Sequence, residues 1–326
     1  MTGGTGFIGG RLVQALRDRG DDVVVLVRSR SRATALIGLG CEIVEGDLND
    51  RVAVERGVEG ADAVFHLAAM FEIGLPKVDR PKMDDANIGG VRRVMDAAAE
   101  AGVARIVYAS TINVFGDTRG KVVDETFVRD ESRGFFSWYD RTKYQAHQLV
   151  MSRAAQGAPV VLVQPGVVYG PGDHFEIGRE ILLAAQGRLL ALMLADIGIT
   201  MSYVDDVVAG MLAAHDSGEI GESYVLGGEN VRLREVLDRA ARLAGRSLTR
   251  RTVPTSALKL VAPTAPLWAK RLGYPSNVRE LIAVSDGKTY WVHDTKAREQ
   301  LGYAPISLDE GLRRTLQHAG TPLANG

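Results

Sequence analysis

The chain has 326 residues, 46% of them hydrophobic and 24% charged, and its formal net charge is -1. These values predict a folded protein with a substantial core, and they exclude a general electrostatic attraction to nucleic acid or to an anionic membrane. Cys41 is the single cysteine, so no intrachain disulfide can form and we expect a cytoplasmic location.

Two further patterns bear on location. The first residues are rich in glycine and lack the basic and apolar regions of a signal peptide. The most apolar tract, 181–199, is interrupted by Gln186, Arg188 and Asp196, so it is not expected to span a membrane. We therefore expect neither a membrane partner nor a nucleic-acid partner.

Short runs rich in valine and isoleucine alternate with amphipathic stretches over the first 170 residues. The predicted elements are a helix from residue 8 to Gly20, strands over 21–28 and 41–47, a polar helix, a strand over 61–69, a helix over 87–101, a strand over 104–111, a helix over 137–156 and a strand over 159–170. This alternation predicts an α/β fold, in which a doubly wound, Rossmann-like parallel sheet has helices on both faces.

The pattern changes after residue 170. The stretch 202–215 predicts the end of a strand and a helix capped by Asp205 and Asp206, and 222–228 predicts a late strand that returns to the first sheet. We therefore assign residues 1–170, completed by 202–228, to a dinucleotide-binding domain. Residues 171–201 and 229–326 are assigned to a smaller, mostly helical substrate-binding portion.

Glycines at positions 3, 6 and 9 open the chain and precede a predicted helix. Gly3 permits a tight turn, Gly6 allows a pyrophosphate to approach the backbone, and Gly9 lets the helix pack closely on the sheet. The N-terminus of the helix then offers free N–H groups and the positive end of a dipole. This spacing predicts a dinucleotide-binding loop, although a simple glycine-rich turn is an alternative.

Only Met1 and Thr2 precede this loop, so the strand that normally leads into it is apparently missing. Burying an apolar central strand contributes about 8–15 kcal/mol, which rivals the stability of a whole domain. We therefore expect that the assigned start of the chain lies inside this strand.

The residue that follows the second predicted strand bears on the choice of dinucleotide. An acidic side chain in that region binds the ribose hydroxyl of NAD. Here the residue is Arg28, followed by Arg30 and Arg32, and a guanidinium can bind a 2′-phosphate with two hydrogen bonds. This pattern favours NADP; NAD, with a solvated basic turn, is the alternative.

Several motifs occur in a characteristic order: "TGGTGFIGG" at 2–10, "GDL" at 46–48, "HLAA" at 66–69, "STINVFG" at 110–116, "YDRTK" at 139–143, "PGVVYGPGD" at 165–173 and "YVDDV" at 203–207. In these motifs the chain resembles the extended short-chain dehydrogenase/reductase family, in its NAD(P)-dependent epimerase/dehydratase and dihydroflavonol-reductase-like branch. The resemblance covers almost the whole chain. It implies the following cofactor-binding residues: Gly3, Thr5, Gly6, Phe7, Ile8, Gly9, Arg28, Asp47, Leu48, Leu67, Ala68, Ala69, Asn87, Tyr139, Lys143, Pro165 and Val168.

Tyr139 and Lys143 are four residues apart, so a helix places them on one face. The resemblance makes them catalytic and adds Thr111. Tyr139 would exchange a proton with a substrate oxygen. Lys143 together with an oxidised nicotinamide would lower the pKa of Tyr139 from about 10 to about 7. His66 and His147 are expected to be structural, and no metal site is expected from the spacing of the six histidines.

These observations predict an NAD(P)-dependent oxidoreductase that acts on a small carbonyl compound or secondary alcohol, with NADP as cofactor. A nucleotide-sugar epimerase or dehydratase with bound NAD is the alternative, but residues 189–206 are largely apolar where a nucleotide needs polar partners. A dinucleotide sensor without catalysis is disfavoured because Thr111, Tyr139 and Lys143 are all present. The family resemblance also implies that the protein can form a homodimer, through helices near 139–143 and Asn87.

Overall fold

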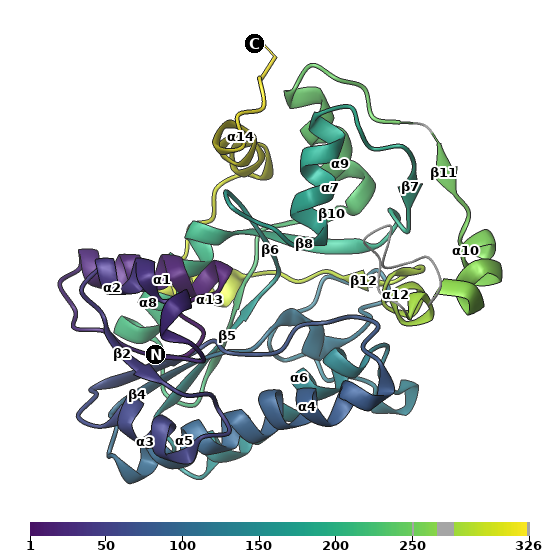
Figure 1. Ribbon diagram of the computed structural model, residues 1–326. Coiled ribbons are helices and arrows are strands. Elements are labelled where there is room, and N and C mark those ends of the chain that lie inside the picture. The colour runs from purple at the N-terminus through teal and green to yellow at the C-terminus, as the bar shows by residue number, and fades with distance from the viewer. Residues whose placement is uncertain (250, 266–276, 325–326) are drawn as a thin grey trace.

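The computed structural model describes residues 1–249, 251–265 and 277–324, which form two lobes (Figure 1). The strands are β1 (Val24–Val27), β2 (Glu42–Glu45), β3 (Ala63–His66), β4 (Arg105–Ala109), β5 (Val160–Pro165), β6 (Val167–Tyr169), β7 (Leu192–Met193), β8 (Gly198–Tyr203), β9 (Ser223–Leu226), β10 (Glu229–Arg232), β11 (Thr252–Val253) and β12 (Thr289–Tyr290). The helices are α1 (Phe7–Asp18), α2 (Thr34–Gly38), α3 (Arg51–Val58), α4 (Arg80–Asp84), α5 (Gly90–Glu100), α6 (Trp138–Ala155), α7 (Glu176–Ala185), α8 (Val204–Ser217), α9 (Leu233–Leu243), α10 (Thr255–Val261), α12 (Val278–Ser285), α13 (Thr295–Leu301) and α14 (Leu308–His318).

The larger lobe is built on a parallel sheet. Strands β3, β4, β5 and β9 lie side by side in that order, and β1 pairs with β2, all in parallel. Helices α1, α8 and α13 cover one face and α3, α5 and α6 cover the other (Figure 1). Because both faces are covered, every residue of β5 is buried, which accounts for the continuous apolar runs in the sequence. The predicted α/β, Rossmann-like, doubly wound sheet is confirmed.

The start of the chain joins the two parts of this sheet. Thr2 forms parallel bridges with Leu26 of β1 and His66 of β3. The Leu26 N–H donates to the Met1 carbonyl at 3.0 Å, and the Thr2 N–H donates to the Phe65 carbonyl at 3.0 Å. Met1 and Thr2 therefore occupy the position that the sequence analysis assigned to a missing strand, as a two-residue extended segment.

The smaller lobe is centred on β8. Strand β10 pairs with β8 in the antiparallel sense, and β6 and β12 pair with it in parallel. Helices α7, α9 and α14 pack around this sheet and share a hydrophobic core with it, in which Ile181, Ile199 and Leu312 are buried. Among the described residues, no helix is both long and apolar enough to cross a membrane.

The chain passes between the lobes more often than the sequence division at residues 170, 202 and 228 implies. Strand β6, within 1–170, joins the sheet of the smaller lobe. Helix α13, within 229–326, belongs to the core of the larger lobe, to which it contributes Ala297 and Leu301. The two lobes are thus connected by several segments that lie far apart in the sequence.

The expected capping role of Asp205 and Asp206 is wrong. Helix α8 has Tyr203 as its N-cap residue, with no side-chain hydrogen bond at the cap. Asp205 instead pairs with Arg11 of α1 at 2.6 Å, and Asp206 accepts a hydrogen bond from the Ile306 N–H at 2.9 Å. Tertiary partners, invisible in the local sequence, occupy both carboxylates.

Candidate active site

The glycine loop forms a tight turn before α1. Gly3 has a φ of 78°, and a Cβ atom there would lie 2.8 Å from the Ala68 nitrogen. A Cβ atom on Gly9 would lie 2.1 Å from the Gly3 carbonyl oxygen. Gly6 is the N-cap residue of α1, whose first turn has neither a capping side chain nor an acidic residue. These features fit a dinucleotide, because a diphosphate can approach the bare backbone at the helix N-terminus.

The other predicted cofactor-binding residues of the sheet follow the ends of parallel strands. They lie after β1 (Arg28), after β2 (Asp47 and Leu48), after β3 (Leu67, Ala68 and Ala69), at the end of β5 (Pro165) and in β6 (Val168). The carboxyl ends of parallel strands meet at one edge of a sheet, which is where dinucleotides bind in such folds. Thr5, Phe7 and Ile8 lie at the same edge because α1 begins there.

Arg28 is exposed immediately after β1. Within the described part of the chain it forms no hydrogen bond or ion pair, so its five N–H donors are free for a ligand. Asp47 is also exposed and accepts a hydrogen bond from the Asn49 N–H at 2.7 Å, which shapes the turn after β2.

Asn87 is buried, and protein groups satisfy its amide. Its Oδ1 accepts from the Met70 N–H at 2.7 Å, and its Nδ2 donates to the Met70 carbonyl and to Thr142 Oγ1, both at 3.0 Å. These bonds hold the loop after β3 against α6. The structure thus gives Asn87 a role in positioning this loop, and the contact with the cofactor that the family resemblance implies stays a prediction.

The N-terminal turn of α6 carries the predicted catalytic residues. Ser137 caps the helix by accepting a hydrogen bond from the Asp140 N–H at 3.0 Å. Tyr139 and Lys143 are both buried on this helix. The Lys143 ammonium donates to the Ala109 carbonyl at 2.9 Å, which ties α6 to the end of β4. Thr111 lies two residues beyond Ala109, and its hydroxyl accepts from the Asn113 N–H at 3.3 Å.

The electrostatics of this pair differ from the expectation. Burial, together with the charge of Asp140, raises the pKa of Tyr139 above its ordinary value, whereas the sequence analysis predicted a lowered pKa. Burial also lowers the pKa of Lys143 to about 8. The physical reason is that loss of hydration disfavours both charged forms. The expected lowering for Tyr139 depended on a cationic nicotinamide in addition to Lys143.

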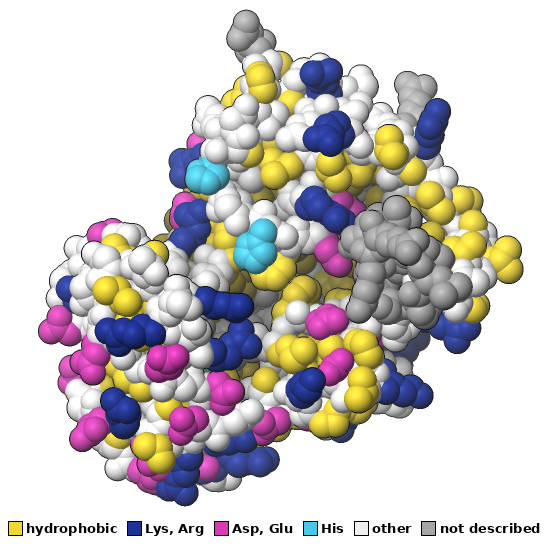
Figure 2. Space-filling view, viewed as in Figure 1, with side chains coloured by type: hydrophobic (Ala, Val, Ile, Leu, Met, Phe, Trp, Pro, Cys, Tyr) yellow, Lys and Arg dark blue, Asp and Glu magenta, His cyan; other side chains and the backbone are white. Residues whose placement is uncertain are grey.

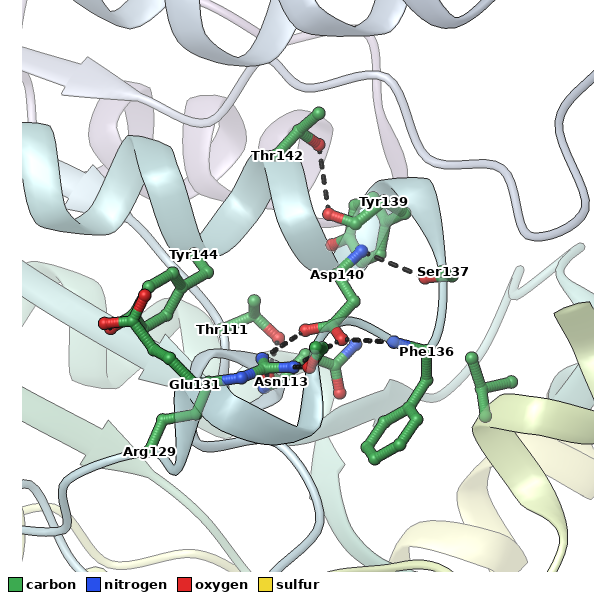
Figure 3. Close-up of polar contacts among 12 residues, drawn as sticks. Thr111, Asn113, Arg129, Glu131, Phe136, Ser137, Tyr139, Asp140, Thr142 and Tyr144 are labelled. Atoms are coloured by element: carbon green, nitrogen blue, oxygen red, sulfur yellow. Dashed lines mark hydrogen bonds and ion pairs between the residues drawn. The ribbon is translucent and has the colours of Figure 1, made fainter. Parts of the chain in front are cut away.

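A buried ion pair beside Tyr139 was missed by the sequence analysis (Figure 3). Arg129 and Asp140 have side chains that are only 4% and 8% exposed. The guanidinium donates to both carboxylate oxygens, at 2.5 and 2.8 Å, and Asp140 Oδ2 also accepts from the Phe136 N–H at 3.0 Å. Arg129 further donates to the Asn113 carbonyl at 3.4 Å, so the pair links the loop of Thr111 to the helix of Tyr139.

His66 and His147 are both buried in the larger lobe. His147 shares a hydrogen bond of 3.0 Å with Ser110, and burial and the charge of Lys143 lower its pKa to about 4. His66 shares one of 2.6 Å with Thr2, and burial lowers its pKa to about 3. Both imidazoles are therefore neutral at ordinary pH. The described residues contain no cluster of metal-binding side chains.

A cavity of about 310 Å³ lies between the lobes. Its lining is largely apolar and includes Ile177 of α7, Ile199 of β8 and Leu281 of α12. Ser137 and Asp140 contribute to it from the first turn of α6. Figure 2 shows hydrophobic side chains along the hollow between the lobes. The cavity thus reaches from the first turn of α6 into the smaller lobe, and its described lining includes none of Thr111, Tyr139 and Lys143.

The fold and this site define an enzyme of the extended short-chain dehydrogenase/reductase type. Residues 1–227 match the model of the NAD dependent epimerase/dehydratase family, and the chain belongs to that family.

Similar proteins cover almost the whole chain. The chain is 31% identical to sterol demethylase protein B of Methylococcus capsulatus, over 94% of this chain and 93% of that protein. It is also 31% identical to a 4-hydroxy-2-methyl-3-oxo-4-farnesyl-3,4-dihydroquinoline-1-oxide ketoreductase of Stigmatella aurantiaca, over 98% and 96%. Among solved structures, MoeE5 in complex with UDP-glucose and NAD is similar, with 25% identity, a TM-score of 0.76, and coverage of 98% of this chain and 97% of that chain.

Proposed function

We propose that the protein is an NADP-dependent oxidoreductase that interconverts an apolar carbonyl compound and the corresponding secondary alcohol. The observation that carries this proposal is the apolar cavity that Ser137 and Asp140 line from the N-terminal turn of α6, the turn to which Tyr139 belongs. The names of two relatives support it, since one is called a sterol demethylase protein and the other a farnesyl-dihydroquinoline ketoreductase. Both names describe largely apolar substrates.

Each proposed catalytic residue has one role in this reaction. Tyr139 donates a proton to the carbonyl oxygen in reduction and accepts it back in oxidation. Thr111 hydrogen-bonds to the same oxygen, and the Lys143 ammonium favours the phenolate that remains after proton donation. A bound dinucleotide supplies or takes the hydride. In reduction, one hydride and one proton are added to the carbonyl group, so the atoms and charges balance.

Arg28 supports the choice of NADP because its guanidinium is exposed and unpaired among the described residues. The family itself is described as NAD dependent. The preference for NADP over NAD is therefore our proposal. We also propose that a small molecule is the physiological partner and that the chain works in the cytoplasm. A homodimer through α5 and α6 stays a prediction.

A nucleotide-sugar epimerase or dehydratase with bound NAD is the second candidate. The likeness to MoeE5, whose structure contains UDP-glucose and NAD, favours it. The cavity disfavours it, because a nucleotide diphosphate needs several polar or cationic partners and Arg179 is the one cationic side chain among the described lining residues.

The test is a screen for oxidation of NADPH and NADH with apolar ketones, aldehydes and UDP-sugars. We expect NADPH oxidation with apolar ketones. Turnover of a UDP-sugar without a net change in the cofactor would instead establish the second candidate. Binding of NADPH without conversion of any of these substrates would contradict both candidate reactions.

We predict that Tyr139→Phe lowers kcat at least about a hundredfold, because the phenyl ring keeps its packing but loses the proton that is transferred. NADPH binding, measured by fluorescence titration, should be unchanged. Near-normal turnover by this variant would exclude Tyr139 as the proton donor.

A further inference from the structure

The cavity contains a carboxyl group for which the described residues provide no hydrogen-bond or ion-pair partner. Helix α7 contributes Glu180 to its lining, together with Glu176, Ile177 and Arg179. Glu180 is half-buried. Within the described part of the chain, no residue forms a hydrogen bond or ion pair with its carboxylate.

The surroundings of Glu180 are poor in hydrogen-bond donors. Most of the lining residues are aliphatic or aromatic, such as Ile197, Leu233 and Val278. Burial raises the pKa of Glu180 to about 7, repulsion from Glu176 adds to this shift, and Arg179 opposes it. Near neutral pH the carboxyl group therefore exists in both protonation states and can accept or donate a hydrogen bond.

Aromatic contacts connect Tyr139 to the helix that bears Glu180. The ring of Phe71, which also lines the cavity, packs edge-on against Tyr139 with centroids 4.8 Å apart. Phe71 makes a second edge-on contact, at 5.9 Å, with Phe175, the residue that precedes α7. A substrate whose carbonyl group reaches Tyr139 can thus extend past Phe71 along α7.

We propose that Glu180 selects apolar carbonyl substrates that carry a hydroxyl group away from the reacting carbonyl, and that this hydroxyl hydrogen-bonds to the Glu180 carboxyl group. The inference rests on the proposed oxidoreductase function. A substrate without such a hydroxyl would cover the carboxyl group and leave it without water or a partner, which weakens binding. A cationic substrate fits less well than one with a hydroxyl group, because the positive charge of Arg179 on the same helix would repel it.

The test compares methyl alkyl ketones with their ω-hydroxy counterparts over a range of chain lengths, with NADPH as reductant. At the best chain length, we expect wild-type kcat/KM to be about tenfold higher for the hydroxy ketone, which corresponds to one hydrogen bond. The difference should lie mainly in KM, because Glu180 does not touch the reacting atoms. Glu180→Leu should bring the ratio near one, and Glu180→Gln, which retains hydrogen-bonding groups, should keep most of it.

A matched control is Glu219→Leu, since Glu219 is an exposed glutamate after α8 and lies outside the lining of the cavity. It should keep the wild-type ratio. A wild-type ratio near one, or a Glu180→Leu variant that retains the preference, would overturn the inference while leaving the oxidoreductase proposal intact.

If no ketone is reduced at all, the oxidoreductase proposal fails. The role of Glu180 is then tested by the binding of the ketones alone. Titration calorimetry of the same two ketone series then measures the preference without turnover. Equal affinity of wild type for both series would overturn the inference as well.

Discussion

Lys143 lies where β4 and α6 meet, and its ammonium is buried against the Ala109 carbonyl. Burial lowers its pKa from 10.5 to about 8. Keeping the positive charge that the proposed chemistry needs therefore lowers the stability of the folded protein. The spacing of Tyr139 and Lys143 could be read from the sequence. The depth of their burial could not, because it depends on the packing of α6 against the end of β4 and against the loop after β3.

The first prediction concerns stability against pH. Lys143 has a pKa of about 8 in the folded protein, whereas an ordinary lysine titrates near 10.4. Between pH 8 and 10 the unfolded chain therefore binds more protons at this residue, so its contribution to stability rises with pH. In the wild type, this contribution increases the free energy of unfolding by about 2 kcal/mol over this range. We expect Lys143→Met to lack this increase. Urea unfolding of both proteins at the two pH values measures it; parallel pH profiles would contradict the prediction.

The second prediction concerns Arg28. Arg28→Ala should raise KM for NADPH about tenfold, because a charge-assisted contact with the 2′-phosphate is lost. KM for NADH should not change. Arg246→Ala removes an exposed arginine in the smaller lobe and serves as the control. Steady-state kinetics with both cofactors give the comparison, and an equal effect on NADH would show that Arg28 does not read the phosphate.

At the scale of elements, α6 is fixed by contacts that the sequence pattern does not show. Its N-cap, Ser137, is local and lies three residues before the amide that it accepts from. The ion pair of Arg129 and Asp140 instead spans a loop of irregular chain. A helical period predicts which side chains share a face of one helix, but it does not predict which loop residue will be buried against that face.

The third prediction follows from this ion pair. Asp140→Ala should lower the free energy of unfolding by about 3–5 kcal/mol, because the Arg129 guanidinium stays buried without a counter-charge. The double variant Arg129→Met/Asp140→Leu should regain most of this loss. Arg153→Met, which breaks a partly exposed pair between Arg153 of α6 and Asp96 of α5, should cost less than about 1 kcal/mol. Urea unfolding measures all three; equal losses for Asp140→Ala and Arg153→Met would refute the argument.

At the scale of the whole molecule, the late segment α13 completes the core of the larger lobe. Leu301 is buried there, and the hydroxyl of Tyr303 donates to the Gly227 carbonyl at 2.7 Å. Strand β6 makes the opposite crossing into the smaller lobe. Since each lobe contains elements from both parts of the chain, we expect the two lobes to unfold together.

The fourth prediction tests this coupling. Leu301→Ala should lower the free energy of unfolding by about 2–5 kcal/mol, because it leaves a cavity beside α8. Leu260→Ala, at a leucine that is 81% exposed, should change it by less than about 0.5 kcal/mol. Tryptophan fluorescence and circular dichroism should report one coincident transition in both variants. Two separate transitions would show that the lobes fold independently.

The sequence by itself determined the α/β class, the order of strands, helices and loops along the chain, the glycine turn and the spacing of Tyr139 and Lys143. These features are local: they depend on periodicity, backbone freedom and neighbours within a few residues. Only the tertiary structure decided that Met1 and Thr2 bridge β1 and β3, that Asn87 is satisfied by protein groups, and that Arg129 pairs with Asp140. It also decided which side chains line the cavity, since burial and pairing depend on residues that meet only after the chain has folded.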